Sequence, residues 1–332
     1  MIDLNTEKIR YREFCNLQSS KIHPNNTADW LDAVCLTGEW GAKFAEEDGQ
    51  IIGIWPYYLK NKRGLLYISE PPFTQFLGPI LLYPENISET KKLLFEKKVL
   101  SILFDEINKI KIDFLNQQLT PELTNWLPLY WKDCTQSTNY TYTRGQLYGL
   151  TEEDLLKSYS KKARKTVCTL IKAGYTCVNA QEIKFSASDF YDLHCYCLHK
   201  LGKEISFERN LLISIVESMV SKNKGSLLVI RDASNKICAA TFVIHNNKET
   251  IAINTAADHE IYGLGYFCKH NQILMATKIG GNYNAGGSMI ESVESVYMKF
   301  GLTQTPYFSI RKEISKRFKI IDATLKLLKV FK

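Results

Sequence analysis

The sequence lacks the features of an exported or membrane-spanning chain. Its first seven residues are acidic and polar, where a signal peptide would be basic and then apolar. The longest uncharged stretch of the first half, residues 71–84, contains four prolines, which exclude a continuous spanning helix. We therefore expect a soluble, cytoplasmic protein without a transmembrane segment.

The cysteines show no framework for disulfides or a metal site. Nine cysteines at irregular spacing, in a chain expected in the cytosol, are typical of reduced thiols. The segment His194-Cys195-Tyr196-Cys197-Leu198-His199 contains metal-binding residue types, but on the helix expected there they face different sides. Zinc sites usually use Cys-x2–4-Cys spacing in a loop. We expect neither disulfides nor a metal.

Positive charge is concentrated at the C-terminal end. The chain has a net charge of +7, and residues 311–332 hold eight Lys or Arg against Glu313 and Asp322. A nucleic-acid-binding protein would normally spread its basic character over a face. Residues 313–332 predict a basic amphipathic helix, whose apolar side either packs on its own domain or contacts an anionic membrane surface. Its apolar positions are Ile314, Phe318, Ile321, Leu325 and Leu328.

Length and pattern predict two domains. At 332 residues the chain is too long for one ordinary core. In the first half, Asp48-Gly49 predicts a hairpin turn between two strands. The elements expected there are a helix at 27–36 capped by Thr27, strands at 43–47, 51–59 and 65–69, a helix at 88–109 and a strand at 110–115.

The second half begins with a capping box at residues 151–154 and an apolar period of 3.6, which predict one helix ending at Gly174. The elements expected after it are a strand at 175–179, helices at 188–200 and 208–221, three antiparallel strands at 227–231, 237–245 and 250–256, a helix at 265–279, a strand at 282–285, a helix at 288–300 and a strand at 307–310. This order resembles a GNAT domain, and the first half a shortened one. We therefore expect an α/β fold with a mixed sheet and two GNAT-like domains in tandem, at residues 1–145 and 146–312.

A glycine-containing loop follows the third of those strands. Tyr262, Gly263, Leu264 and Gly265 lie between a strand and a helix, where unpaired backbone amides and a positive dipole end favour an anion. The alternative is an ordinary strand-to-helix connection. These four residues are our candidates for binding the pyrophosphate of coenzyme A.

Four short segments, in the right order, resemble the FemAB-like branch of the GNAT superfamily. They are Pro71 to Pro79, Lys162 to Tyr175, Tyr283-Asn284-Ala285-Gly286-Gly287-Ser288, and Lys299-Phe300-Gly301 followed by Gln304 and Pro306-Tyr307. The resemblance covers most of the chain between residues 30 and 312. One departure is that the family's aspartate is Asn284, which hydrogen-bonds but does not take a proton near neutral pH.

The resemblance implies an enzyme that transfers an acyl group to an amine, with no metal. The donor implied is an acyl-CoA, with acetyl-CoA favoured, and the acceptor is an amino sugar or peptide of the cell envelope. One alternative is a Fem-like aminoacyl transferase whose donor is an aminoacyl-tRNA. Another is a binding protein that kept the scaffold and lost the chemistry, since fold does not determine function.

Acyl transfer to an amine needs a base, an acid and acceptor ligands. Glu294 is our candidate base and Tyr283 our candidate acid. The alternative for Glu294 is a solvated helix residue, and the alternative for Tyr283 is a packed strand residue. The candidate substrate ligands are Lys161 and Arg164 on a basic helix face shared with Lys157 and Lys165, Gln75 in the proline-rich loop, Asn284 and Ser288.

Overall fold

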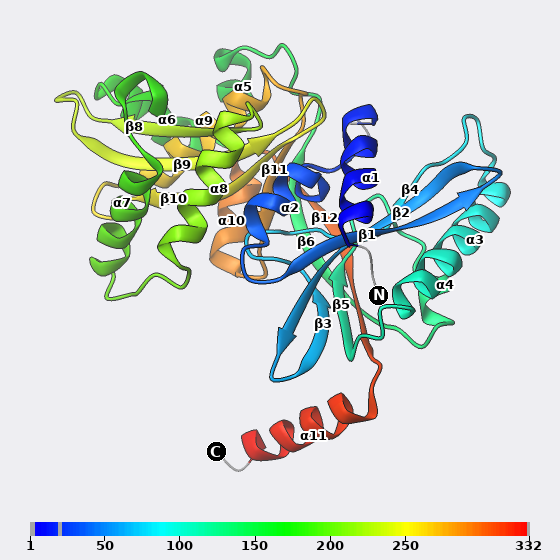
Figure 1. Cartoon of the computed structure of the whole chain (residues 1–332). Coiled ribbons are helices and arrows are strands. Elements are labelled where there is room, and N and C mark those ends of the chain that lie inside the picture. Colours follow the sequence, from blue (N-terminus) through cyan, green and yellow to red (C-terminus); the bar gives the residue numbers. More distant parts are fainter. Residues whose placement is uncertain (1–3, 19–21, 331–332) are drawn as a thin grey trace. The chain divides into compact units, whose positions relative to one another are not determined.

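The computed structural model describes residues 4–18 and 22–330, and the chain divides into two compact units (Figure 1). Unit 1 comprises Met1–Gln18, Asn25–Asn139 and Pro306–Lys332. Unit 2 comprises Ser19–Pro24 and Tyr140–Thr305. Two strands, β6 (Thr135–Arg144) and β12 (Thr303–Glu313), contribute residues to both units. Unit 1 therefore takes its last strand from the C-terminal end of the chain.

The sheet of unit 1 is mixed. Its strands are β1 (Glu39–Glu47), β2 (Gln50–Lys62), β3 (Leu65–Ser69), β4 (Ile80–Leu81) and β5 (Phe114–Gln118), in the order β1-β2-β3-β5-β12 with β4 beside β2. The β3–β5 pair is parallel. The hairpin predicted at Asp48-Gly49 is confirmed, and both residues have positive φ, at 51° and 75°, as its tight turn requires.

The helices of unit 1 include both predicted and unpredicted ones. The helices are α1 (Leu4–Leu17), η1 (Pro24–Asn26), α2 (Ala28–Val34), α3 (Glu89–Asn108), α4 (Leu127–Tyr130) and α11 (Lys316–Val330). Thr27 caps α2 as predicted, accepting a hydrogen bond from the Trp30 amide. The strand predicted at 110–115 begins only at Phe114, because Lys111 has a positive φ of 57° that interrupts an extended chain. α1, α4 and β6 were not predicted.

The start of α11 packs on unit 1. The Phe318 ring stacks on Phe114 at a centroid distance of 4.5 Å and meets Tyr67 edge to face at 5.8 Å. The side chains of Leu325 and Leu328, two of its predicted apolar positions, lie outside the described residues. Within the described part of the chain, no helix has both the length and the apolar character needed to cross a bilayer.

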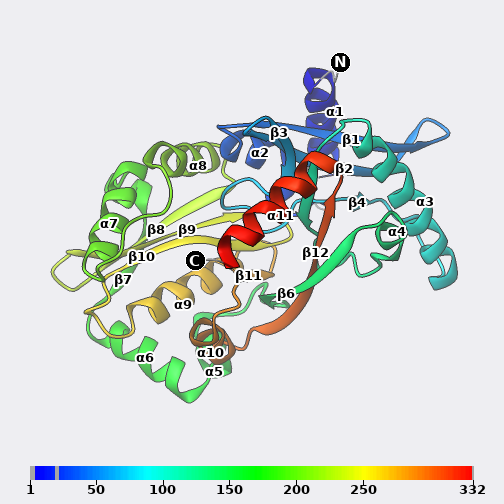
Figure 2. The ribbon, with the colours of Figure 1, turned by 90° about the horizontal axis from the view of Figure 1, so that it is seen from below.

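The sheet of unit 2 has helices on both faces (Figure 2). Its remaining strands are β7 (Thr176–Asn179), β8 (Gly225–Arg231), β9 (Ile237–His245), β10 (Thr250–Ala257) and β11 (Tyr283–Gly287), in the order β6-β11-β10-β9-β8-β7. α7 (Ala187–His199) and α8 (Arg209–Ser221) cover one face, and α6 (Lys161–Lys172) and α9 (Leu264–Ala276) lie on the other. The predicted order is confirmed, with η2 (Ala180–Ile183) after β7 and α10 (Glu291–Lys299) after β11.

The single helix predicted from residue 151 to Gly174 is wrong. The chain forms α5 (Glu152–Ser158) and α6, and Tyr159 between them is extended. The Tyr159 ring packs edge to face on Phe300 at 4.8 Å, and the Ser160 amide donates to the Lys299 carbonyl. These distant contacts override the local helical period. Lys157 consequently lies on α5 and does not share a helix face with the basic residues of α6.

We predict that Gly174→Ala lowers the free energy of unfolding by about 1–2 kcal/mol, because a side chain is strained at positive φ. Gly174 has φ of 82°, and an added Cβ would lie 2.9 Å from the Ala233 Cβ. The matched control is Gly265→Ala in α9, where an added Cβ meets nothing within 4 Å. Urea unfolding of the two variants measures the difference. Equal midpoints would contradict the prediction.

Candidate functional site

Two neighbouring parallel strands of unit 2 part after a short pairing. β10 and β11 pair only at Thr250–Tyr283 and Ile251–Asn284, although β10 continues to Ala257 and β11 to Gly287. The register of β10 against β9 shifts between Ala252 and Asn254, so that Ile253 is an extra residue in β10. We call residues 252–257 of β10 and 285–287 of β11 the parted edges.

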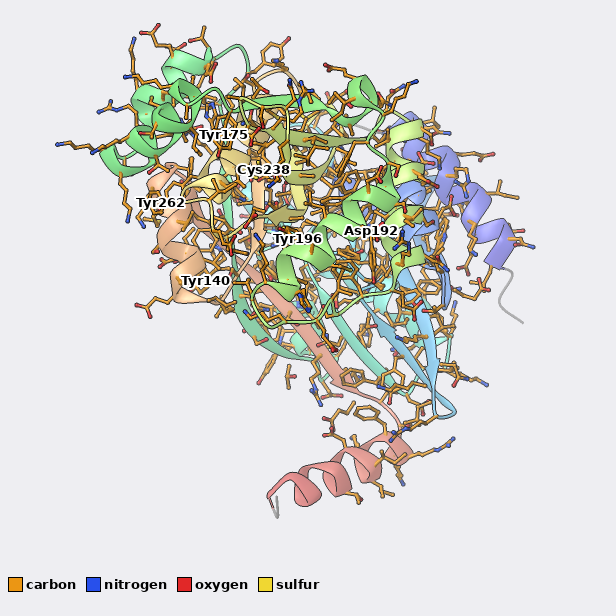
Figure 3. All side chains as sticks on the ribbon, turned by 90° about the vertical axis from the view of Figure 1, so that its left-hand side faces the viewer. Tyr140, Tyr175, Asp192, Tyr196, Cys238 and Tyr262 are labelled. Carbon is orange, nitrogen blue, oxygen red and sulfur yellow. The ribbon has the colours of Figure 1, made fainter. Side chains whose placement is uncertain are left out.

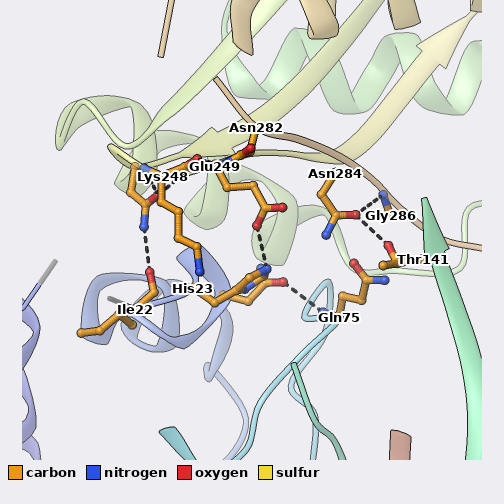
Figure 4. Close-up of polar contacts among 11 residues, drawn as sticks. Ile22, His23, Gln75, Thr141, Lys248, Glu249, Asn282, Asn284 and Gly286 are labelled. Atoms are coloured by element: carbon orange, nitrogen blue, oxygen red, sulfur yellow. Dashed lines mark hydrogen bonds and ion pairs between the residues drawn. The ribbon is translucent and has the colours of Figure 1, made fainter. Parts of the chain in front are cut away.

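Asparagine side chains bind backbone amides at the parted edges. Asn284 Oδ1 accepts hydrogen bonds from the Gly286 amide at 3.0 Å and from Thr141 Oγ1 at 2.7 Å (Figure 4). On β10, Asn254 Oδ1 accepts from the Thr255 amide at 2.8 Å. Each strand therefore satisfies amides locally where the ladder between them ends.

The glycine-containing loop after β10 forms an open helix N-terminus. Gly263 precedes α9 with φ of 87°, Tyr262 is exposed (Figure 3), and Leu264 is buried with its amide donating to the Ile261 carbonyl. In the described chain, the amides of Gly265 and Tyr266 have no hydrogen-bond partner. Free amides at the positive end of a helix favour an anionic group.

Helix α6 packs directly against this loop. A Cβ on Gly263 would lie 2.4 Å from Thr166 Cγ2, so no larger residue fits there. At 100° per residue, Lys162 shares the side of α6 that carries Thr166, whereas Lys161 and Arg164 lie on the opposite side. The helical geometry thus favours Lys162, which was not among the residues predicted from the sequence, as the basic side chain beside the loop. The substrate-binding roles of Lys161 and Arg164 stay predictions.

A cavity of about 260 Å³ brings two predicted residues together. Glu294 on α10 and Ser288 before it both line it, and Tyr142 in its wall accepts a hydrogen bond from Gln304 Nε2 at 3.0 Å. The lining carries two carboxylates and no basic side chain, which suits an amine. The lining residues are Tyr140 (labelled in Figure 3), Tyr142, Ser288, Met289, Ile290, Glu291, Glu294 and Gln304.

Tyr283 lies in the core of unit 2, in a chain of hydrogen bonds. Its hydroxyl accepts from Lys269 Nζ at 2.9 Å and donates to Gln272 Oε1 at 2.6 Å. Gln272 Nε2 donates to Thr241 Oγ1, which donates to the Asn254 carbonyl at 3.1 Å. Burial raises the pKa of Tyr283 well above its ordinary value. Its role as general acid stays a prediction, and the geometry gives its hydroxyl a partner on each side.

Lys269 is a functional candidate that the sequence reasoning missed. Its Nζ lies 4.7 Å from the Tyr297 ring centroid and 5.5 Å from that of Tyr283. Desolvation lowers the pKa of Lys269 to about 7. The available signal was its place between the buried Cys268 and His270 on a helix that is otherwise largely apolar.

Gln75 and the histidine segment do not line this cavity. Gln75 belongs to unit 1, where its amide donates to Asn25 Oδ1 at 3.3 Å. On α7, the His194 ring stacks on Phe207 at 5.5 Å. Across the described residues, no group of three or more His, Cys, Asp or Glu is placed to hold a metal ion.

Comparisons with known proteins give the fold. No protein-family model and no curated protein matches the sequence. A solved structure described as FemX has a TM-score of 0.65 at 11% identity, covering 93% of this chain and 96% of its own. L-PGS from Bacillus licheniformis has a TM-score of 0.56 at 12% identity, covering 94% of each chain. A tandem GNAT protein from the clavulanic acid biosynthesis pathway has a TM-score of 0.50 at 10% identity, covering 93% and 95%. The protein thus has the FemAB-like, tandem GNAT fold predicted from its sequence.

We predict that removing the Lys269 amine changes how stability depends on pH. Between about pH 7 and 10 the unfolded chain holds a proton on Lys269 that the folded protein does not, so stability should rise with pH there. Tyr283, Tyr297 and Cys268 face or adjoin this amine and are unchanged in Lys269→Met. Relative to that variant, the wild-type free energy of unfolding should rise by up to about 1.4 kcal/mol per pH unit.

Chemical denaturation at several pH values measures this difference. The control is Lys278→Met, since Lys278 is exposed just beyond α9. Its curve should run parallel to that of the wild type. A parallel curve for Lys269→Met as well would show that the Lys269 amine is charged in the folded protein throughout this range.

Proposed function

We propose that the protein is an N-acyltransferase that uses an acyl-CoA, with acetyl-CoA favoured, and an amine acceptor. The observation that carries the proposal is the parting of β10 and β11 beside the open N-terminus of α9. Free amides at Gly265 and Tyr266, with Lys162 on the adjoining helix, would bind the phosphates of the donor. The parted edges would admit its acyl end.

The cavity beside α10 would hold the acceptor. Glu294 and Glu291 attract a protonated amine, and the rings of Tyr140 and Tyr142 provide apolar walls. In the reaction, Glu294 takes the proton from the amine, whose nitrogen bonds to the thioester carbonyl carbon. The carbon–sulfur bond then breaks, and coenzyme A leaves as a thiolate that takes up the second proton lost by the nitrogen. Glu294 returns its proton to solvent.

An aminoacyl-tRNA remains the alternative donor. The fold similarity to a structure described as FemX and the exposed Lys161, Lys162, Arg164 and Lys165 of α6 support keeping it. A cell-envelope amino sugar or peptide as acceptor, and contact of α11 with an anionic membrane, are proposals that rest on the FemAB-like resemblance and on the basic C-terminal sequence. A binding protein without activity is the further alternative.

Donor binding tests the proposal directly. Calorimetric titration of the purified protein with acetyl-CoA, and separately with charged tRNA, should show binding of acetyl-CoA. Gly265→Asp should weaken that binding at least about tenfold, because a carboxylate there repels phosphates. The same carboxylate favours a helix N-terminus, so the variant should remain as stable as the wild type. Gly265→Ala is the matched control and should bind normally.

Binding of charged tRNA without acetyl-CoA would transfer the proposal to the Fem-like alternative. If neither donor binds, both the acyl-CoA-dependent and the aminoacyl-tRNA-dependent transferase hypotheses are excluded. Unchanged acetyl-CoA affinity in Gly265→Asp would show that the amides ahead of α9 do not hold the donor.

Glu294→Gln tests the base. We predict that the variant lowers kcat/KM about 10²-fold or more at neutral pH, since an amide cannot take the amine proton. Glu291→Gln is the control, because Glu291 lines the same cavity and lies one turn earlier on α10. Initial rates of acetyl transfer to a panel of amines measure both variants. Equal losses in the two would assign the carboxylates to binding and leave the reaction without this base.

A further inference from the structure

The middle of β10 holds a hydrogen-bond donor that the fold leaves unused. Asn254 Nδ2 is shielded from solvent and has no hydrogen-bond partner within the described chain. Leaving a buried donor unpaired is costly, and such groups call for an explanation. Thr250 Oγ1 is a second unpaired group on β10, but it lies where β10 still pairs with β11. Asn254 lies beyond Ile251, the last residue of β10 that pairs with β11.

The backbone places the Asn254 carboxamide on the free edge of β10. Thr241 on β9 donates to the Asn254 carbonyl, which therefore points toward β9. In a planar trans peptide the following N–H points the opposite way, so the Thr255 amide faces the edge that β11 leaves. Asn254 Oδ1 accepts that amide. The carboxamide thus covers a strand position that a paired β11 would have occupied.

Small residues flank this position. On β10 the residue before the bulge is Ala252, and on β11 the residues after the last pair are Ala285 and Gly286. A Cβ on Gly286 would lie 3.7 Å from the Ala252 carbonyl oxygen. The Ala285 carbonyl is taken by the Tyr297 hydroxyl at 3.1 Å. On β11, residues 285–287 carry no side chain that could accept a hydrogen bond from Asn254 Nδ2.

The Asn254 peptide is held from behind. Thr241 Oγ1 accepts from Gln272 Nε2, and Gln272 in turn accepts from Tyr283, which accepts from Lys269. Thr255 Oγ1 joins this chain, since it lies 2.7 Å from Thr241 Oγ1 and accepts from Gln272 Nε2 at 3.2 Å. The chain fixes the Asn254 carbonyl and, through the rigid peptide, the position of its neighbour's amide. A fixed donor with no partner is what stabilises charge that develops on a reacting oxygen.

We propose that Asn254 is a catalytic residue whose side-chain amide donates a hydrogen bond to the acyl carbonyl oxygen of the donor. The assignment rests on the proposed acyl transfer. As the amine nitrogen bonds to the carbonyl carbon, the electron pair of the C=O bond moves to oxygen, and Asn254 stabilises that oxyanion. When the carbon–sulfur bond breaks, the C=O bond is restored. The Thr255 amide, occupied by Asn254 Oδ1, does not serve this purpose itself.

Asn254→Asp is the decisive variant. An aspartate keeps the oxygen that accepts the Thr255 amide, and so keeps the strand geometry, but presents a second oxygen where the donor nitrogen was. We expect kcat to fall by about 10²- to 10³-fold with the KM for the amine unchanged. Asn254→Ala should lose a similar factor. Asn271→Ala is the control, because Asn271 on α9 also uses its Nδ2, to bond the Phe267 carbonyl; its rate should stay within about threefold of wild type.

A spectroscopic probe separates this bond from a general structural effect. The probe is an acetyl-CoA analogue with a methylene group in place of the thioester sulfur and a ¹³C-labelled carbonyl. Bound to the wild type and to Asn271→Ala, its carbonyl stretch should shift to lower frequency, and in Asn254→Asp and Asn254→Ala the shift should disappear. An unchanged shift or an unchanged kcat in Asn254→Asp would overturn the assignment. If the wild type neither binds the analogue nor transfers acetyl groups, the proposed function fails first, and the assignment fails with it.

Discussion

The end of the ladder between β10 and β11 is the constraint on which the site depends. Two parallel strands that stop pairing expose backbone amides and carbonyls that must find other partners. Here Asn254 and Asn284 take up amides on the two strands, and the extra residue Ile253 lets β10 turn out of register without leaving β9. The same parting leads β10 to the Gly263 turn and starts α9 beside it. The parting of the strands therefore creates both features that a donor would use, the parted edges for its acyl end and the N-terminus of α9 for its phosphates.

Local sequence determined the elements that need no distant partner. The Asp48-Gly49 turn supplies its own positive φ angles, Thr27 caps a helix with its own hydroxyl, and the three strands β8 to β10 follow one another in sequence. β6 could not be predicted in this way. Its segment is polar and its partner β11 lies more than a hundred residues away, so its extended form depends on tertiary pairing.

The same limit explains the misread helix and the missed lysine. The 3.6-residue period continues through Tyr159, but the Phe300 ring and the Lys299 carbonyl, both distant in sequence, favour an extended residue there. For the site, the sequence named Glu294 and Ser288 as candidates, and the structure places both at one cavity, where their nearness in the chain brings them together. Lys269 meets Tyr283 and Tyr297 only after α9, β11 and α10 have packed, and its lowered pKa is a property of that packing.

Asn284 bears on whether the chemistry has been lost. In the sequence it stands where the FemAB-like pattern has an aspartate. This departure suggested the alternative of a binding protein that kept the scaffold and lost the chemistry. The structure gives its carboxamide a different task, since Asn284 is buried, with Oδ1 between the Thr141 hydroxyl and the Gly286 amide. A charged aspartate there would have to be desolvated, whereas a neutral asparagine accepts the same two hydrogen bonds without that cost. The residue that departs from the pattern therefore serves the strand parting, and it does not by itself argue against a reaction at those edges.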